Sequence, residues 1–529
     1  MSKTKLYLPL IIGIAAAIGI YIGGKLNFSD HSDRVFTSNS KKDKLNRLID
    51  YIEYDYVENI NTDSIVDVAV NEILDNLDPH STYIPKEDLQ KVQESMKGDF
   101  VGIGINFYTF KDTITVISSL KNSPSEKAGI LGGDRIITIN GDSISTTNQF
   151  NPHLVKQIKG EINTTVNLGI YRKTLEKFLN IKVKRDVIPI KSVDANYMIN
   201  DSLGYIKLNR FAESSYKEFI TALKTLKKTG AKSLVLDLRN NPGGFITIAN
   251  QIVDEFIEAD KLILFTKNKR GDIEKRFSTE KGLFKNNAIY VLINESSASA
   301  SEILAGALQD NDKGTIIGRR SFGKGLVQRE MELGDGSAIR LTVSKYYTPT
   351  GRSIQRNYSK GNNNYYNEYY NRYNSGELTD KTKIEIDDSL KFTTPKGKTV
   401  YGGGGIIPDV FVPLDKGMNN KTLEYIEKSG LTRQFVFELL EKNRISYSKL
   451  KENDFINNFI VEDTIVNKYE TFLQQKTQSN IVFTTYKEEV KHYIKANLAD
   501  QLFGGNTYRK ILGKHDNMIK KVLELEVNK

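Results

Sequence analysis

The chain has 529 residues, a formal net charge of +10 and no cysteine. The absence of cysteine excludes disulfides and a lipid anchor on cysteine, so an exported chain of this kind must rely on its buried cores. Basic residues are mixed with acidic ones, which disfavours nucleic acid as a partner and favours contact with anionic lipid or cell wall. No cluster of histidine, cysteine and carboxylate has metal-ligand spacing, so we expect no metal and no other cofactor.

The N-terminus predicts a membrane anchor within residues 1–26. An uncharged run over residues 6–24 follows Lys3 and Lys5, and as a helix it covers about 28 Å, close to the thickness of the hydrocarbon layer of a membrane. The two lysines predict a cytoplasmic N-terminus, which leaves the bulk of the chain on the periplasmic or extracytoplasmic side. A cleaved signal peptide is the alternative, but the run is long and lacks a convincing A-x-A site before Lys25.

Residues 27–97 are predicted to form a helical segment. Apolar residues recur with helical spacing at Leu45, Leu48, Ile49 and Ile52, and again at Ile65, Val68, Ala69, Ile73 and Leu74. The segment contains L-D-P-H-S-T-Y-I-P at 77–85, where His80 follows Asp78-Pro79 in an expected turn between helices. We interpret His80 as a structural residue and not as a metal ligand.

Residues 98–186 predict a small β domain. Its opening, F-V-G-I-G-I-N-F at 100–107, is typical of a glycine loop that leads into an edge strand. Together with A-G-I-L-G-G-D-R-I-I-T-I-N-G at 128–141 it resembles a PDZ domain, in which a peptide adds as a strand and presents its carboxylate to backbone N–H groups. The predicted peptide-binding residues are Phe100, Val101, Gly102, Ile103, Gly104 and Ile105. Alternatively, the apolar side chains among them build the core of the domain itself.

Residues 187–415 alternate strand and helix patterns, which predicts an α/β core. One buried strand, S-L-V-L-D-L-R at 233–239, leads into the turn N-P-G-G at 241–244. Unhindered N–H groups in such a turn can face a developing negative charge, although an ordinary tight turn is the alternative. We interpret Asp237 and Arg239 at the end of the strand as a buried salt bridge or loop anchor.

The stretch N-E-S-S-A-S-A-S-E-I-L-A-G-A-L-Q-D, residues 294–310, raises the question of a serine nucleophile. It follows a buried strand over 288–294 and leads into a helix, so its serines lie where unpaired N–H groups favour an oxyanion. The alternative is plain helix capping, with Ser299 or Ser301 as the N-cap and Glu302 in the first turn.

A serine nucleophile needs a base, and no histidine lies between residues 154 and 491. Lys324 is the candidate, because flanking glycines in G-R-R-S-F-G-K-G-L-V-Q at 318–328 let the backbone turn sharply, and burial would lower the pKa of the lysine. An exposed loop lysine is the alternative. The pattern S-x-x-K at 321–324 also occurs in penicillin-binding proteins, but these glycines argue against the helix that such a site needs.

Two further regions complete the chain. Residues 356–385 are rich in tyrosine and asparagine, and their lack of apolar periodicity favours a flexible insertion over an aromatic substrate surface. Residues 416–529 return to helical spacing and predict a C-terminal helical domain that serves packing, formation of a homo-oligomer or adaptor binding.

In their order along the chain, these motifs resemble those of the C-terminal processing, or tail-specific, serine proteases, a family with a PDZ domain and a Ser/Lys dyad. The resemblance covers about residues 40–415 and includes L-V-L-D-L-R-N-N-P-G-G, S-A-S-A-S, F-G-K-G and G-I-I-P-D-V. It implies that Ser299 is the nucleophile, that Lys324 is the general base and that Gln328 holds this lysine. It further implies an oxyanion hole formed by the N–H of Ala300 and that of Gly243 or Gly244.

The resemblance therefore implies an α/β protease core with an inserted PDZ domain, acting on proteins or peptides with free C-termini. Two rival hypotheses are open. One is a PDZ scaffold that has lost its activity, which intact Ser299, Lys324 and Gln328 disfavour. The other is a penicillin-binding-like acyl enzyme that acts on the cell wall.

Overall fold

The computed structural model describes residues 13–14, 16–17, 40–110, 113–144, 152–414, 421–447, 449–479 and 481–527. The chain divides into two compact units, residues 1–73 and 74–529. The predicted anchor over residues 6–24 lies outside the described residues, apart from four helical ones at 13, 14, 16 and 17. Within the described part, no helix has the length and apolar character needed to cross a membrane.

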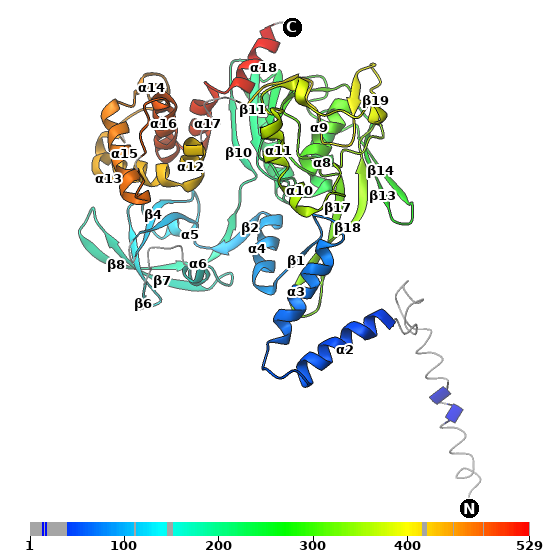
Figure 1. Cartoon of the computed structure of the whole chain (residues 1–529). Coiled ribbons are helices and arrows are strands. Elements are labelled where there is room, and N and C mark those ends of the chain that lie inside the picture. The colour runs from blue at the N-terminus through cyan, green and yellow to red at the C-terminus, as the bar shows by residue number, and fades with distance from the viewer. Residues whose placement is uncertain are drawn as a thin grey trace, which may run out of the picture. The chain divides into compact units, whose positions relative to one another are not determined.

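The first unit contains α2 (Ser40–Tyr54) and most of α3 (Thr62–Asp75), drawn in blue in Figure 1. Both helices confirm the helical character expected of the N-terminal segment. The second unit opens with β1 (Thr82–Ile84) and α4 (Lys86–Lys97). A two-stranded antiparallel ribbon then follows, made of β2 (Asp99–Gly102) and β9 (Asp186–Pro189), which lead into and out of the small β domain.

The small β domain is an antiparallel sheet in the order β3-β4-β5-β7-β8, with β6 paired to β5. Its strands and helices are β3 (Ile105–Phe110), β4 (Thr113–Ser119), α5 (Pro124–Lys127), β5 (Arg135–Ile139), β6 (Asp142–Ser143), α6 (Pro152–Ile158), β7 (Thr165–Arg172) and β8 (Lys177–Lys184). Alternate residues of the strands, such as Ile114, Val116 and Ile136, point into a separate apolar core. Because β3 is at the end of the sheet, one edge of β3 has no partner strand among the described residues.

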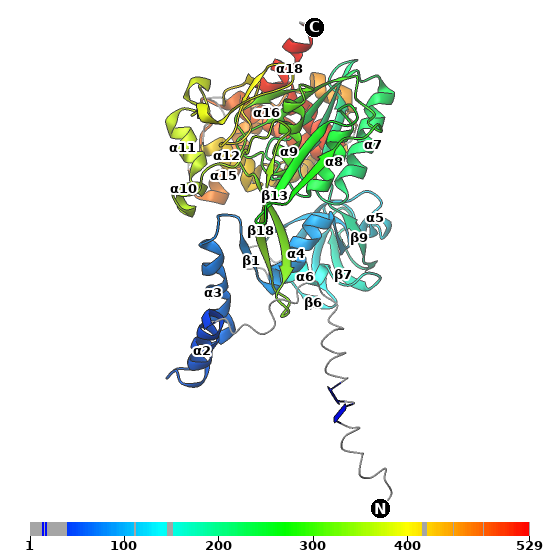
Figure 2. The ribbon, with the colours of Figure 1, turned by 90° about the vertical axis from the view of Figure 1, so that its right-hand side faces the viewer.

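The central sheet of the α/β core has the order β10-β11-β12-β15-β16-β21. The pairs from β11 to β21 are parallel, and β10 is antiparallel to β11. Its strands are β10 (Val193–Met198), β11 (Leu203–Leu208), β12 (Ser233–Asp237), β15 (Ala288–Ile293), β16 (Gly314–Gly318) and β21 (Val410–Phe411). The helices α7 (Ser215–Thr229), α8 (Ile246–Asp254) and α9 (Ala300–Asp310), which Figure 2 labels, pack on one face of this sheet. Burial on both faces explains the nearly continuous apolar runs that predicted these strands.

A second, antiparallel sheet has the order β1-β18-β13-β14, with β17 also paired to β18. It contains β13 (Leu262–Asn268), β14 (Ile273–Phe277), β17 (Leu326–Glu332) and β18 (Ala338–Tyr347). β17 starts two residues after Lys324, and β1 brings the segment around His80 to the same sheet. This sheet therefore places two distant motifs of the sequence beside each other.

The region 356–385 differs from the flexible insertion that its composition favoured. It folds into α10 (Asn362–Tyr366), α11 (Glu368–Ser375) and a short 3-10 turn, η2 (Lys381–Lys383). A second such turn, η3 (Asp388–Leu390), and the hairpin of β19 (Lys391–Thr393) and β20 (Thr399–Tyr401) follow. The helices are held by buried Tyr365 and Arg372 and not by an apolar stripe, so apolar periodicity could not reveal them.

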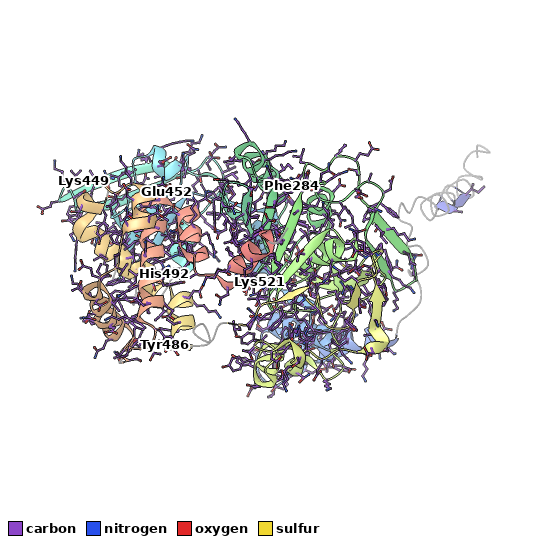
Figure 3. All side chains as sticks on the ribbon, turned by 90° about the horizontal axis from the view of Figure 1, so that it is seen from above. Phe284, Lys449, Glu452, Tyr486, His492 and Lys521 are labelled. Carbon is purple, nitrogen blue, oxygen red and sulfur yellow. The ribbon has the colours of Figure 1, made fainter. Side chains whose placement is uncertain are left out.

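The C-terminal region is helical, as expected. It contains α12 (Lys421–Ser429), α13 (Leu431–Tyr447), α14 (Glu452–Asn458), α15 (Asp463–Thr477), α16 (Lys487–Phe503), α17 (Gly505–Gly513) and α18 (Asn517–Val527). Most of these helices share an apolar core of their own. Figure 3 shows Lys449, Glu452, Tyr486 and His492 on this helical domain, and Lys521 on α18.

The last helix, α18, belongs to the α/β core. Met518, Ile519 and Val522 pack with Val235 and Tyr290 on the face of the central sheet that α7, α8 and α9 leave uncovered. The Glu526 carboxylate accepts hydrogen bonds from the hydroxyls of Ser233 and Tyr290. The second face of the sheet is thus buried by residues that lie more than two hundred positions further along the chain.

Candidate active site

The three serines of S-A-S-A-S have different surroundings. Ser297 is fully buried, and its hydroxyl donates to the Leu238 carbonyl and accepts from the Asn294 N–H. Ser301 is equally buried and donates to the Asn241 carbonyl. Ser299 is partly exposed, and its side chain forms a capping box with Glu302 at the start of α9. Only Ser299 therefore offers a hydroxyl to an incoming molecule.

Ser299 has an unusual backbone conformation at the N-terminus of α9. Its φ of 55° and ψ of −114° lie in a region that residues other than glycine rarely occupy. Such a conformation costs on the order of 1–3 kcal/mol and persists only where the surrounding structure holds it. As expected for the capping alternative, Ser299 occupies the N-cap position and Glu302 lies in the first turn. Capping and catalysis are therefore compatible functions of the same stretch.

The carboxylate of Glu302 joins the serine stretch to the lysine loop. Its Oε2 accepts the N–H groups of Ser299, at 2.9 Å, and of Lys324, at 2.8 Å. Its Oε1 accepts the Gly323 N–H, at 2.6 Å, and the Ser321 hydroxyl, at 2.5 Å. Burial raises the pKa of this carboxyl, and the four donors oppose that shift. One side chain thus fixes the backbone of both candidate reactive residues.

A second side chain joins the same two segments. The hydroxyl of Tyr346, on β18, lies 2.9 Å from the Lys324 carbonyl and 3.3 Å from the Ser299 carbonyl. The ring is almost fully buried, and burial raises the pKa of its hydroxyl well above the usual value. Tyr346 therefore remains a neutral hydrogen-bond donor at all ordinary pH values.

The Lys324 side chain is mostly buried, and its ammonium group donates a hydrogen bond to a neutral acceptor. Its Nζ donates to Oε1 of Gln328 at 2.7 Å, and Nε2 of Gln328 donates to the carbonyl oxygen of His80. Because the His80 carbonyl can only accept, the amide of Gln328 must direct its oxygen toward the lysine. The L-D-P-H-S turn therefore orients the glutamine that holds Lys324.

Burial is the main cause that lowers the pKa of Lys324, from its ordinary value to about 8. The positive charge of Arg340 lowers this pKa further, whereas the carboxylates of Asp78 and Glu302 raise it. The neighbouring His80 ring is neutral, because burial and the charge of Lys324 lower its pKa to about 3. A lysine with a pKa near 8 can lose its proton close to neutral pH and act as a base.

The N-P-G-G turn lies directly against Ser299. A Cβ atom at Gly243 would approach the Ala300 nitrogen and the Ser299 Cβ to 2.8 Å, so only glycine fits there. The Gly243 N–H donates to Oδ1 of Asn241, whereas the N–H groups of Gly244 and Ala300 meet no acceptor among the described residues. Of the two glycines implied by the resemblance, Gly244 therefore has the unpaired amide.

Asp237 and Arg239 form the ion pair expected at the base of this turn. The guanidinium of Arg239 contacts both carboxylate oxygens of Asp237 and, on its other side, Asp516 at the start of α18. The Lys207 ammonium is a further partner of Asp237. The C-terminal helix is thus connected to the strand end that leads into the N-P-G-G turn.

The six residues proposed to bind peptide fall into two groups. Phe100, Val101 and Gly102 belong to β2 and pair with β9, so they lie in the ribbon beside the PDZ-like sheet. Ile105 begins β3, the edge strand. Between them, the side chain of Ile103 is buried in the core of the domain, and the N–H groups of Ile103 and Gly104 meet no acceptor among the described residues.

The sequence analysis missed two connecting residues and one backbone group. The sequence predicts Glu302 only as a helix-cap residue and does not point to Tyr346, and His80 contributes through its carbonyl oxygen. A glutamate three residues after the middle serine matches the capping-box pattern, which was a local signal for Glu302. No comparable signal exists for Tyr346, because its contacts depend on how β18 crosses the two loops. Within the described residues, no group of three or more potential metal ligands occurs.

A partly exposed serine at a strained helix start and a lysine with a lowered pKa, whose backbones are joined through Glu302, are groups that a serine hydrolase could use. Comparison with known proteins agrees with this class. Residues 202–361 match Peptidase family S41, residues 101–183 match the PDZ domain family, and residues 422–504 match a family of unknown function, DUF8443.

Among curated relatives, a carboxy-terminal-processing protease of Bartonella bacilliformis is 39% identical over 315 residues, which cover 58% of this chain and 71% of the relative. The carboxy-terminal processing protease CtpA of Bacillus subtilis is 35% identical, over 67% of this chain and 75% of the relative. A probable CtpA-like serine protease of Staphylococcus aureus is 33% identical, over 79% and 82%.

The chain therefore belongs to peptidase family S41 and is a serine peptidase of the carboxy-terminal processing type, with a PDZ domain. Among solved structures, the photosystem II D1 C-terminal processing protease is similar at 23% identity and a TM-score of 0.36, over 70% of this chain and 86% of that one.

Proposed function

We propose that this peptidase cleaves polypeptides near their C-termini through an acyl-enzyme on Ser299, with Lys324 as the general base. The observation that carries the proposal is the Glu302 carboxylate, which holds the backbone amides of partly exposed Ser299 and of mostly buried Lys324 at once. The lysine donates to a neutral glutamine oxygen instead of a carboxylate, so loss of its proton is not opposed by a direct ion pair with Gln328.

The steps follow from these positions. Ser299 Oγ attacks the scissile carbonyl carbon and passes its proton to Nζ of neutral Lys324. The N–H groups of Ala300 and Gly244 supply hydrogen bonds to the oxyanion. When the C–N bond breaks, Lys324 returns the proton to the leaving amine. Water then attacks the ester carbon with Lys324 again as base, which releases the acid and restores Ser299.

The PDZ domain supplies the preference for C-termini in this proposal. A peptide can add to the open edge of β3, and its terminal carboxylate can accept the N–H groups of Ile103 and Gly104. Main-chain pairing carries little sequence information, so the carboxylate and the adjoining side chains provide the selectivity.

Replacing the two reactive residues tests the catalytic assignment. We expect Ser299→Ala and Lys324→Ala each to lower kcat for an unfolded protein by about 10⁴-fold or more, and the double variant to be hardly worse than either one, because the two residues act as a unit. Ser296→Ala changes an exposed serine three residues away and is the matched control. Full activity in Ser299→Ala, or complete loss of activity in a chelator, would contradict the proposal.

We further propose that residues 6–24 anchor the protein in the membrane with the catalytic part on the extracytoplasmic side, supported by the length of the apolar run and by Lys3 and Lys5. Cell fractionation tests this. The full chain should sediment with membranes and resist extraction by salt, whereas a chain without residues 1–26 should not. Recovery of both chains in the same fraction would count against an anchor. The C-terminal helices are a candidate site for a homo-oligomer or an adaptor.

A further inference from the structure

The helices α10 and α11 are fixed to the catalytic side of the molecule. The buried ring of Tyr365 lies edge-on to His80, and its hydroxyl is 2.7 Å from Nε2 of that histidine. Nη1 of Arg372 donates to the carbonyls of Arg320 and Ser321, which precede Lys324 in the same loop. From Tyr365 the contacts lead through His80 and Gln328 to Lys324. These two helices are therefore neighbours of the catalytic base.

The side of the two helices next to these buried residues carries exposed tyrosines. Tyr366, Tyr369, Tyr370 and Tyr373 are exposed to 57%, 39%, 63% and 45%. Tyr369, Tyr370 and Tyr373 have the spacing of one face of α11, and Tyr366 is the last residue of α10. An ordinary protein surface carries apolar residues singly and scattered. Four exposed tyrosines within eight positions form a larger patch than this, because each ring exposes a large area. We call these four residues the tyrosine face.

The composition around this face indicates what it binds. Residues 356–377 consist largely of tyrosine, asparagine, serine and glycine, the residue types that antibody binding loops use to contact many different surfaces. Tyrosine offers a large rigid ring with few rotatable bonds and a hydroxyl, while asparagine adapts its hydrogen bonds. Such a surface suits a partner of variable sequence. An unfolded polypeptide is a partner of that kind.

We propose that the tyrosine face holds an extended, unfolded segment of the substrate next to the catalytic site. The proposal rests on the proposed function and adds a second substrate contact, independent of the PDZ domain. The tyrosine face adjoins the catalytic site, because Tyr366, a member of the face, donates to the Pro79 carbonyl, one residue before His80. This position supports a segment of the substrate as the molecule that the face binds. Since the faces of aromatic rings attract cations, apolar and basic segments bind more tightly than acidic ones.

The test uses a labelled peptide of about 20 residues, which would extend about 65 Å, with an acetylated N-terminus and an amidated C-terminus. Without a free carboxylate, the peptide lacks the group that the PDZ domain recognises. Binding is measured by fluorescence anisotropy in Ser299→Ala. We expect the triple change Tyr369→Ala, Tyr370→Ala and Tyr373→Ala to weaken binding about tenfold, since it removes three rings that can stack on the peptide. Alanine preserves helix propensity, and the thermal melting temperature checks the fold.

Two matched variants make the result specific. The triple Tyr→Phe variant keeps the rings and should bind within about twofold of the parent. Tyr425→Ala removes a similarly exposed tyrosine from α12 and should have no effect. Equal binding by the triple alanine variant, or an equal loss in Tyr425→Ala, overturns the proposal. A peptide rich in aspartate and glutamate should bind more weakly than one rich in leucine and arginine, and the reverse order also contradicts it.

In the active chain, the triple alanine variant should raise KM for an unfolded protein about tenfold, in line with the loss of binding. An unchanged KM overturns the proposal that the tyrosine face binds substrate. It leaves the assignment of Ser299 and Lys324 intact. Conversely, cleavage of the peptide by the Ser299→Ala chain contradicts the proposed function, and the KM comparison then still decides on the tyrosine face.

Discussion

The catalytic region and the PDZ domain use their backbone groups in opposite ways. Around Ser299 and Lys324, the Glu302 carboxylate and the Tyr346 hydroxyl occupy backbone donors and acceptors of both loops. In the PDZ domain, β3 has one partner strand, and the Ile103 and Gly104 amides meet no acceptor among the described residues. The first arrangement fixes geometry before substrate arrives, and the second leaves hydrogen-bonding groups for an incoming chain.

Outside the two reactive residues, removal of the Glu302 charge should have the largest effect, because it breaks the fixed arrangement. In Glu302→Gln, one oxygen becomes an NH₂ group that faces N–H donors and cannot accept them. We expect kcat to fall about 100-fold or more, since buried hydrogen bonds to a charged group contribute about 1.5–3 kcal/mol each. Glu332→Gln, on an exposed residue of β17, is the control. Unchanged kcat would show that Glu302 does not position the two residues.

The open edge of the PDZ domain predicts the second effect. Amidation of a substrate's C-terminus removes the charge that the free N–H groups would bind, so we expect kcat/KM to fall about tenfold. Changes at residues next to the scissile bond should matter less. The measurement compares free-acid and amidated peptides of the same sequence. Equal rates would refute C-terminal recognition and leave the assignment of Ser299 unaffected.

The pH dependence tests the electrostatics of the fixed region. A neutral Lys324 is required, so activity should rise with pH through the lysine pKa of about 8. Since the charge of Arg340 lowers this pKa, Arg340→Gln should move the rise to higher pH and reduce activity at pH 7. Arg340→Lys keeps the charge and should keep the profile. A shift to lower pH in Arg340→Gln would mean that another group titrates.

The smallest expected effect concerns a contact between the PDZ domain and the C-terminal helices. Glu441 on α13 pairs with Arg135 and Lys173 of the PDZ domain, and Phe437 lies against Tyr108 of β3. The pair is partly exposed, so Glu441→Gln should cost no more than about 1 kcal/mol and should be masked by high salt. A thermal melt at low and at high ionic strength measures this. A large loss that persists in salt would contradict a surface ion pair.

The local parts of the site could be predicted from the sequence. Ser299, Lys324 and Gln328 lie in short motifs whose glycines and helix signals are visible in a window of a dozen residues. The choice of Ser299 over Ser297 and Ser301 came from the resemblance, and the structure adds a physical reason, because the other two hydroxyls are buried and hydrogen-bonded. The sequence could not indicate which amides of the N-P-G-G turn are unpaired, since this depends on the Asn241 side chain.

The long-range parts of the fold were less accessible. The strands of the central sheet and the PDZ sheet follow from their apolar patterns, whereas the pairing of β2 with β9 joins segments more than eighty residues apart. The helices α10 and α11 depend on a buried arginine and a buried tyrosine, which no periodicity reveals. The C-terminal helices were expected as an appended domain, but α18 contributes to the core, because its apolar face matches an uncovered sheet face.

The position of α18 also has a consequence for synthesis of the protein. The face of the central sheet that carries Val235, Tyr290 and Leu292 stays exposed until Met518, Ile519 and Val522 have left the ribosome. Asp516, the partner of Arg239, arrives at the same time. A nascent chain that already contains Ser299 and Lys324 therefore lacks a finished core. The buried core on this face of the sheet is therefore complete only after α18 has packed against it.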